Sequence, residues 1–236
     1  MLELRFFQFL NKYNRVFEND SINLISSFKN LDSELPNNSW PKSCLIELLS
    51  NNSIEKDINF IIPTLIQIIR KNQKIIIFSN NIYKHYNTLL LSGIPENLIM
   101  IIDSQSSIDK ILKLNMGGKI PIGAVIGWID NKHSFISLQK IQACLKTSNA
   151  FSFLFRPLST KDKPSPAPLR ITLENIGLSK IRLMVLKRRG PTVPKKFDVD
   201  LSKKNVDKNC EFVIFNKRHK LLNKYLYDYT QQHLTN

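Results

Sequence analysis

The segment that joins the first strong strand signal to the next helix contains no glycine. It reads Ser-Asn-Asn-Ser-Ile-Glu-Lys-Asp over residues 50–57, after an apolar strand pattern at residues 44–49. The phosphate-binding loop G-x-x-x-x-G-K-[ST] needs glycines so that backbone N–H groups converge on the phosphates, and a hydroxyl after its lysine to hold Mg²⁺. Here Lys56 is followed by Asp57, and the carboxylates of Glu55 and Asp57 repel a phosphate although they suit the positive end of a helix. The layout is that of a nucleotide-binding protein, but its phosphate chemistry is predicted to be lost.

Cysteine is scarce, which excludes two further classes of protein. The three cysteines, Cys44, Cys144 and Cys210, are far apart and form no C-x-x-C pair. Neither a disulfide framework nor a thiolate metal site is therefore indicated. We expect a reducing compartment.

No stretch of the chain predicts a membrane segment. The first ten residues carry Glu3 among apolar side chains and no small-residue cleavage site, and the longest apolar run, residues 58–69, is interrupted by Pro63. That run is too short to cross a bilayer. The chain is predicted to be a soluble cytoplasmic protein without a membrane partner.

Catalytic and metal-binding patterns are also missing. The four histidines lie on different predicted elements without helical or turn spacing for a metal, and no G-x-S-x-G nucleophile turn occurs. Cys144 falls on an amphipathic helix, where a small buried apolar residue is expected. We therefore predict no catalytic residues, no metal and no cofactor.

Positive charge is abundant and unevenly distributed. The formal net charge is +15, with 16 Lys and Arg against 12 Asp and Glu in residues 1–155, and 18 against 7 in residues 156–236. A basic last third predicts a polyanionic or acidic partner. The competing interpretation is a solvated surface, because the chain is rich in Lys, Asn and Ile throughout.

Short apolar runs alternate with helical patterns through the first two thirds of the chain. Runs such as KIIIF and LIMII suit strands that are buried on both faces, and the alternation predicts an α/β fold with a mostly parallel sheet flanked by helices. The predicted strands are residues 44–49, 74–79, 98–102, 124–129 and 150–155, and the predicted helices are residues 58–71, 83–92, 108–114 and 135–147.

The pattern changes after Arg156. A proline-rich basic loop comes first, and then residues 169–174 and 180–187 alternate like a β-hairpin around residues 175–179. The predicted organisation is a short N-terminal helical arm (1–23), a main domain (24–202) and a basic, Tyr-rich C-terminal tail (203–236). In that tail, residues 211–215 could form a strand and residues 219–232 a helix.

Several ordered segments resemble the ImuA/SulA family of RecA-like proteins. They are LISSFKNLDSELPNNSWPKSCLIELLS, SGIPENLIMI, AVIGWID and AFSFLFRPLS, within residues 24–201. SulA-like chains stop soon after the FLFRP strand, whereas SPAPLRITLE followed by IRLMVLKRRGP is typical of ImuA-like chains. Both segments are present, so the resemblance favours ImuA, with SulA as the alternative.

The resemblance implies a degenerate RecA-like domain that does not hydrolyse ATP. A working RecA-type ATPase ends a strand in an Asp that positions Mg²⁺. Here that strand ends in Gly127, Trp128 and Ile129, and Asp130 comes past the position. An ImuA-like protein would support translesion DNA synthesis in the SOS response, with RecA, an ImuB-like polymerase homologue and an error-prone polymerase as partners. DNA is a further candidate partner. A SulA-like protein would instead bind FtsZ and block septation.

Candidate contacts with DNA or a protein partner follow from these patterns. They are Trp128, Arg156, Lys161, Lys163, Lys187, Arg188 and Arg189. Trp128 either caps the sheet core or is presented at the strand end to a partner. Arg156 either holds a phosphate or a partner carboxylate, or pairs with an internal acid. The resemblance implies that the loop with Lys161 and Lys163 contacts DNA, and the KRRG turn either contacts phosphate or an acidic partner or is a solvated hairpin end.

Overall fold

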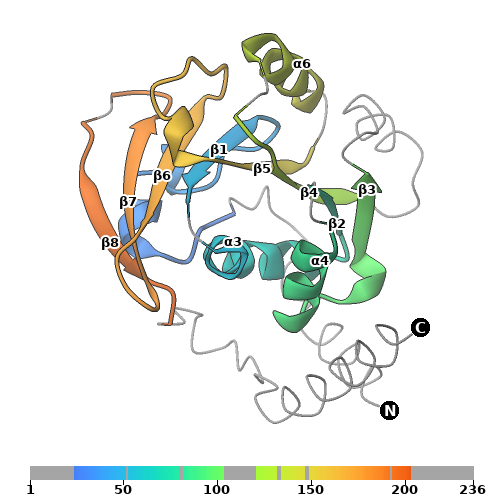
Figure 1. The fold of residues 1–236 in the computed structure, drawn as a ribbon. Coiled ribbons are helices and arrows are strands. Elements are labelled where there is room, and N and C mark those ends of the chain that lie inside the picture. Colours follow the sequence, from blue (N-terminus) through green and yellow to red (C-terminus); the bar gives the residue numbers. More distant parts are fainter. Residues whose placement is uncertain are drawn as a thin grey trace, which may run out of the picture. The chain divides into compact units, whose positions relative to one another are not determined.

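A single sheet of eight strands organises the part of the chain that the structure describes (Figure 1). The structure is a computed structural model, and it describes residues 24–51, 53–79, 82–103, 121–131, 134–146, 149–191 and 193–202. The strand order is β3-β2-β4-β5-β1-β6-β7-β8. The strands are β1 (Leu45–Ser50), β2 (Lys74–Ser79), β3 (Ile99–Asp103), β4 (Ile122–Trp128), β5 (Phe151–Arg156), β6 (Leu169–Asn175), β7 (Lys180–Lys187) and β8 (Lys196–Asp200).

Six neighbouring strands, β1 to β6, are parallel. Parallel pairs join β3 to β2, β2 to β4, β4 to β5, β5 to β1, and β1 to β6. Strand β7 returns antiparallel to β6, and β8 is antiparallel to β7. Strands β1 and β5 are buried along their whole length, as expected for parallel strands covered on both faces.

The described α-helices cover both faces of the sheet. Helices α3 (Ile54–Ile69) and α4 (Ile82–Leu91) lie on one face, and α6 (Phe135–Leu145) lies on the other (Figure 1). Helix α3 begins after Ser53, whose side chain accepts a hydrogen bond from the Lys56 N–H as an N-cap. Two short elements, α2 (Lys29–Asp32) and the 3-10 helix η1 (Pro36–Asn38), lead into β1.

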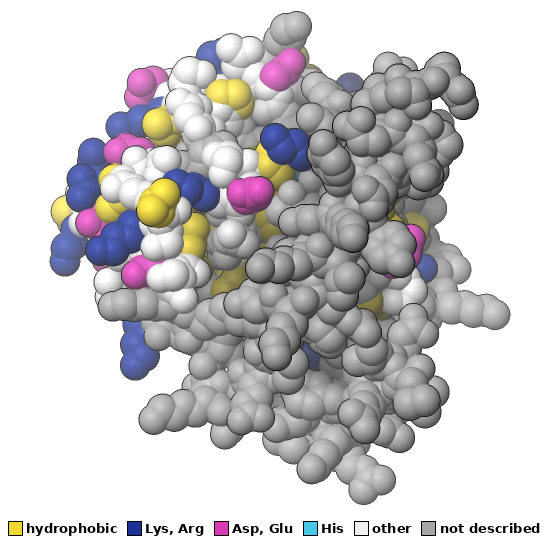
Figure 2. Space-filling view, turned by 60° about the horizontal axis from the view of Figure 1, so that its bottom comes forward, with side chains coloured by type: hydrophobic (Ala, Val, Ile, Leu, Met, Phe, Trp, Pro, Cys, Tyr) yellow, Lys and Arg dark blue, Asp and Glu magenta, His cyan; other side chains and the backbone are white. Residues whose placement is uncertain are grey.

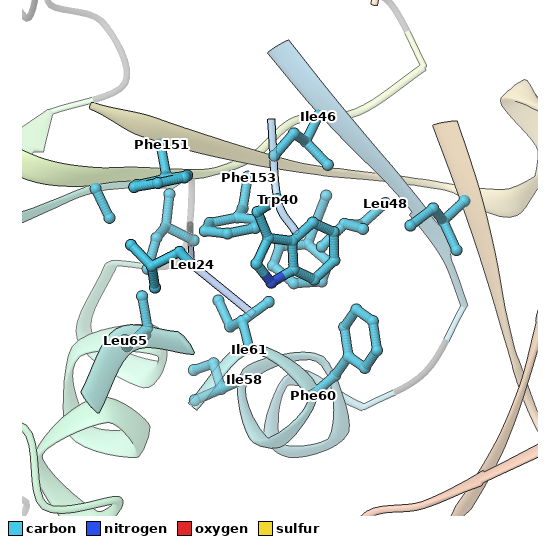
Figure 3. Close-up of a cluster of buried hydrophobic side chains, with 14 of the residues drawn as sticks. Leu24, Trp40, Ile46, Leu48, Ile58, Phe60, Ile61, Leu65, Phe151 and Phe153 are labelled. Carbon is cyan, nitrogen blue, oxygen red and sulfur yellow. The ribbon is translucent and has the colours of Figure 1, made fainter. Parts of the chain in front are cut away.

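The larger core lies between the sheet and α3. Trp40, from the segment before β1, packs edge-on against Phe60 of α3 and Phe153 of β5, with ring centroids 6.2 and 5.2 Å away (Figure 3). Its indole N–H donates to Thr64 Oγ1 at 2.8 Å. Since burying a large aromatic side chain removes much apolar surface from water, Trp40 ties the entry segment to both α3 and the sheet. A second core lies under α6 and includes Leu138.

The α/β architecture with a mostly parallel sheet is confirmed, and so is the hairpin of β6 and β7. The prediction that the first long helix starts at residue 58 was wrong, because Ser53 caps the helix and its first residue, Ile54, lies four residues earlier. Strand β8 was not predicted. The predicted arm (1–23), helix (108–114) and tail (203–236) lie outside the described residues. None of the helices in the described ranges combines the length and apolar character needed to span a bilayer.

Candidate functional site

The connection between β1 and α3 stands where a nucleotide-binding protein would hold its phosphates. It has only residues 51–53 between the last strand residue and the first helical residue. Ser50 donates a hydrogen bond to Asp57 Oδ1 at 2.6 Å, which joins the end of β1 to the first turns of α3. Asn51 Oδ1 accepts the Leu158 N–H at 3.1 Å. The connection is therefore short; a hydrogen bond between its two flanking elements spans it, and Asn51 joins it to the segment after β5.

Lys56 is engaged by the β-hairpin. Its Nζ donates to Asn175 Oδ1 at 2.6 Å and to the carbonyl oxygen of Gly177 at 2.7 Å. Asn175 Oδ1 also accepts the Gly177 N–H at 3.2 Å. The lysine that the sequence places near a phosphate-loop position thus holds the β6–β7 turn.

Trp128 is the last residue of strand β4. Its ring stacks on Phe155 of β5 with centroids 5.1 Å apart, and its other neighbour is the His85 ring at 3.8 Å. Trp128 is half-buried and packs against the larger core, as the first of its two interpretations predicts. Its indole nitrogen is buried and has no hydrogen-bond partner among the residues that the structure describes.

Arg156 forms a buried ion pair with an acid of this chain. Its Nη1 donates to Glu47 Oε1 at 2.9 Å, and the two side chains are 1 % and 0 % exposed. Arg170 Nε donates to the other oxygen of the same carboxylate at 2.7 Å. Of the two alternatives for Arg156, the structure shows the internal acid, so this side chain is not available to a phosphate or a partner carboxylate in this conformation.

One of these three charged residues, Arg170, also anchors the basic loop. Arg170 Nη1 donates to the carbonyl oxygen of Lys161 at 3.1 Å, and its Nη2 donates to that of Thr160 at 3.0 Å. We call Glu47, Arg156 and Arg170 the buried charge triad. It joins three neighbouring strands, β5, β1 and β6, to the loop after β5.

The two lysines of this loop differ in surroundings. Lys163 is exposed, and its Nζ donates to the carbonyl oxygen of Asn131 at 3.2 Å. Lys161 is half-buried, and its backbone carbonyl is the acceptor for Arg170. The loop therefore presents Lys163 to solvent while its backbone is held by the buried charge triad.

The consecutive cations at the end of β7 do not act as one group. Lys187 is exposed and donates to the carbonyl oxygen of Ser165 at 3.1 Å. Arg188 is half-buried, donates from Nη1 to the carbonyl oxygen of Glu34 at 2.6 Å, and has the Glu34 carboxylate 3.8 Å away. Arg189 is exposed. Of the three, Arg188 lies beside an acid, whereas Lys187 and Arg189 are exposed and form no ion pair within the described ranges.

Sequence reasoning missed Glu47 and Arg170. Both are charged residues inside strands that are otherwise apolar, in the runs CLIELL and PLRITL. A charge in such a strand is a usable signal, because buried charges in proteins are paired. The partner of each could not be identified without the strand register.

No cluster of three or more His, Cys, Asp or Glu side chains that could hold a metal ion occurs within the described ranges. The site contains four features. They are the short β1–α3 connection, Lys56 bound to the β6–β7 turn, the stacked rings of Trp128 and Phe155, and the buried charge triad. Beside the Trp128 ring, the buried Ser79 hydroxyl lies 3.0 Å from His85 Nδ1. No protein-family model matches the chain, and no curated protein matches it.

Proposed function

We propose that this chain is a non-catalytic, RecA-like accessory protein of the SOS DNA-damage response, which supports translesion DNA synthesis in the cytoplasm. Its partners in this proposal are RecA, an ImuB-like polymerase homologue and an error-prone polymerase. The proposal rests on the ordered resemblance to the ImuA/SulA family within residues 24–201. The α/β fold, with β1 in the middle of the sheet, is compatible with it.

The observation that carries the non-catalytic part is the geometry of the β1–α3 connection. Helix α3 begins at Ile54, before Lys56, and its first turns are joined to β1 by the hydrogen bond from Ser50 to Asp57. Backbone N–H groups that should converge on phosphates would need the longer, glycine-containing loop. Lys56 has its own acceptors in the hairpin. This arrangement supports a protein that acts through its surfaces.

The segments that distinguish ImuA-like from SulA-like chains support the first assignment. They form β6 and β7, and these strands extend the sheet beyond β1. Arg170 and Lys56 fasten this extension to the rest of the domain. In this proposal, β6 and β7 are therefore an integral part of the folded domain.

Sedimentation with purified components tests the proposal. The full-length chain is mixed with RecA filaments assembled on single-stranded DNA, and separately with FtsZ polymers, both from the same organism. We expect the chain to pellet with RecA filaments and to leave FtsZ assembly unchanged. Inhibition of FtsZ assembly without RecA binding would instead establish the SulA-like role. Calorimetry with MgATP is expected to detect no binding.

A matched pair of variants then tests the loop after β5. Lys163→Glu changes an exposed cation of that loop, and Lys84→Glu makes the same change on the exposed surface of α4. If the loop contacts the filament, Lys163→Glu weakens co-sedimentation and Lys84→Glu does not. Equal binding by both variants would remove the loop from the proposed interface.

A further inference from the structure

The edge at which the parallel strands begin carries a row of cations. We call it the amino edge: the Ser43 N–H donates to the Ala150 carbonyl there, and the Lys74 N–H donates to the Pro121 carbonyl. Strand β7 ends at the same edge, since Lys187 is opposite Arg170 near the start of β6. Six residues make up this row, and we call them the amino-edge cations: Lys42, Lys71, Lys74, Lys146, Lys187 and Arg189. Lys74 is half-buried, and the other five are exposed.

Cations from different elements lie close together at this edge. Lys42 Nζ is 6.0 Å from the centre of the Phe151 ring. Burial lowers the pKa of Lys71, and the charge of Lys42 lowers it further. Burial raises the pKa of Cys44, at the start of β1, to about 11, and the charge of Arg189 acts in the opposite direction. The charge of Lys42 thus acts on Lys71, before β2, and the charge of Arg189 acts on Cys44, before β1.

Among the described residues, no ion pair joins an acid to any of these six cations, and two acids of the segment before β1, Asp32 and Glu34, have other contacts. Asp32 Oδ1 accepts the Ser26 N–H at 2.7 Å, and Glu34 is the acid beside Arg188. Arg188 is for this reason not counted among the amino-edge cations. Like charges held together without counter-charges repel each other, and a bound polyanion relieves that repulsion.

The β8 margin of the sheet shows the opposite arrangement. Arg182 pairs with Asp198 at 2.7 Å, and Lys196 lies 3.7 Å from Glu174. Figure 2 shows dark blue and magenta side chains mixed along one margin of the described surface. Lysine and arginine are thus paired with acids at β8, whereas the amino-edge cations have no such partners among the described residues.

The chemistry of the amino edge favours the backbone of a duplex over other polyanions. Single-stranded nucleic acid is held by exposed aromatic side chains on which bases stack. The exposed aromatic residues of the described ranges, Tyr83 and Phe135, lie in the first turns of α4 and α6, at the opposite edge. Interfaces with protein partners have an apolar core, whereas interfaces with DNA are polar and strongly positive.

The size of the row also fits a duplex. Five strand spacings separate β2 from β7, which is about 24 Å at 4.7–4.9 Å per spacing. Duplex DNA presents one phosphate per about 1.7 Å of its axis, so about seven base pairs lie along this length. We propose that the amino edge binds the phosphate backbone of duplex DNA without reading its sequence. This surface goes beyond the proposed function, because it acts independently of contacts with RecA or a polymerase.

Fluorescence anisotropy with a labelled 20-base-pair duplex and the full-length chain tests this surface between 50 and 300 mM salt. With six phosphate contacts, the logarithm of the binding constant is expected to fall with the logarithm of salt with a slope of about −5. The double variant Lys42→Ala/Lys71→Ala should flatten this slope by about 2 and weaken binding on the order of tenfold to fiftyfold at 0.1 M salt. Lys187→Ala/Arg189→Ala should have a similar effect.

The control is Lys84→Ala/Lys140→Ala, which removes the same charge from exposed positions of α4 and α6. It should retain at least half of the wild-type affinity, and circular dichroism verifies that each variant is folded. Equal slopes for the amino-edge variants and the control would overturn the proposal. So would tighter binding to the single strand of the same sequence, or displacement of the duplex by polyglutamate at equal charge concentration. Failure of RecA co-sedimentation leaves this result unaffected, so the two proposals fail separately.

Discussion

Arg156 of β5 and Glu47 of β1 form an ion pair at 2.9 Å in which both side chains are almost completely shielded from solvent. Glu47 is shared with Arg170, so a single carboxylate neutralises two guanidiniums. The buried charge triad therefore carries a net charge of +1. This imbalance makes its members unequal in their contribution to stability.

Glu47→Gln should destabilise the fold more than Arg156→Met. The first change leaves two buried guanidiniums without a counter-charge, and we expect a loss of about 3–5 kcal/mol in the free energy of unfolding. The second leaves the balanced pair of Glu47 and Arg170 and should cost about 1–3 kcal/mol. Urea denaturation followed by circular dichroism measures both.

The double variant Glu47→Gln/Arg156→Met should be more stable than the sum of the single losses predicts, because it removes one of the unneutralised guanidiniums. Arg182→Met, at an exposed ion pair, is the matched control and should change stability little. Additive losses, or equal losses for both single variants, would contradict the shared role of Glu47.

Lys56→Ala should loosen the β-hairpin without affecting any nucleotide chemistry. Since Lys56 is near the surface, its loss should lower the free energy of unfolding by about 1 kcal/mol or less. The Gly177 and Ile176 amides, which close the turn, should exchange with solvent faster. Hydrogen exchange measured by mass spectrometry on the hairpin peptide reports this change.

The matched control for that experiment is Lys84→Ala, which should leave exchange in the hairpin unchanged. MgATP turnover should be undetectable in the wild type and in both variants. Turnover that is present in the wild type and lost in Lys56→Ala would assign the lysine to nucleotide binding and contradict the structure-based interpretation.

Cys44 should resist alkylation in the folded protein. Burial raises the pKa of its thiol from 9.0 to about 11, so the thiolate fraction at pH 8 falls on the order of a hundredfold. Iodoacetamide labelling at pH 8, read by peptide mass spectrometry, should modify Cys44 at least that much more slowly before unfolding than after it.

Arg189→Ala should slow the alkylation of Cys44 further, because the Arg189 charge lowers the pKa of the thiol against the effect of burial. Lys187→Ala is the control at the neighbouring exposed position and should have no comparable effect. Faster labelling in Arg189→Ala would show that the guanidinium shields Cys44 and does not act through its charge.

The Asp198 carboxyl should titrate below its ordinary pKa of 3.8, because it accepts a hydrogen bond from Arg182 and lies beside its charge. A pKa that is lower in the folded state stabilises the fold above pH 4, and this stabilisation is lost as the pH falls through the folded-state pKa. In Arg182→Gln, NMR titration should return the carboxyl pKa toward 3.8. Lys187→Gln, at the end of the same strand, should leave it unchanged.

Much of the sheet could be predicted because its strands are short, apolar and bounded by helical patterns. The run KIIIFS was placed as observed, at Lys74–Ser79. Strand β8 was missed because KFDVD has three charged residues among five and no apolar run, although Phe197 and Val199 alternate with the charges as in a half-buried strand. The early start of α3 could have been found from Ser53, a favoured N-cap residue that precedes acidic residues in the first turn.

The candidate contacts could be predicted only as residue types. A sequence shows that Arg156 follows a strand, but not whether an acid lies across the sheet from it. The distance of 109 residues between Glu47 and Arg156 is closed only by the pairing of β1 with β5. The hairpin turn that binds Lys56 lies 119 residues further along the chain.

The amino-acid sequence alone determined the alternation of apolar strands and helices, the glycine-free connection after β1 and the excess of positive charge. These properties follow from local pattern and composition, which need no knowledge of neighbours. Only the tertiary structure decided which charges are buried in pairs, which lysine holds the hairpin and which cations share the amino edge. Those outcomes depend on strand order and register, because electrostatic and hydrogen-bonding interactions act over a few ångströms in space and not along the chain.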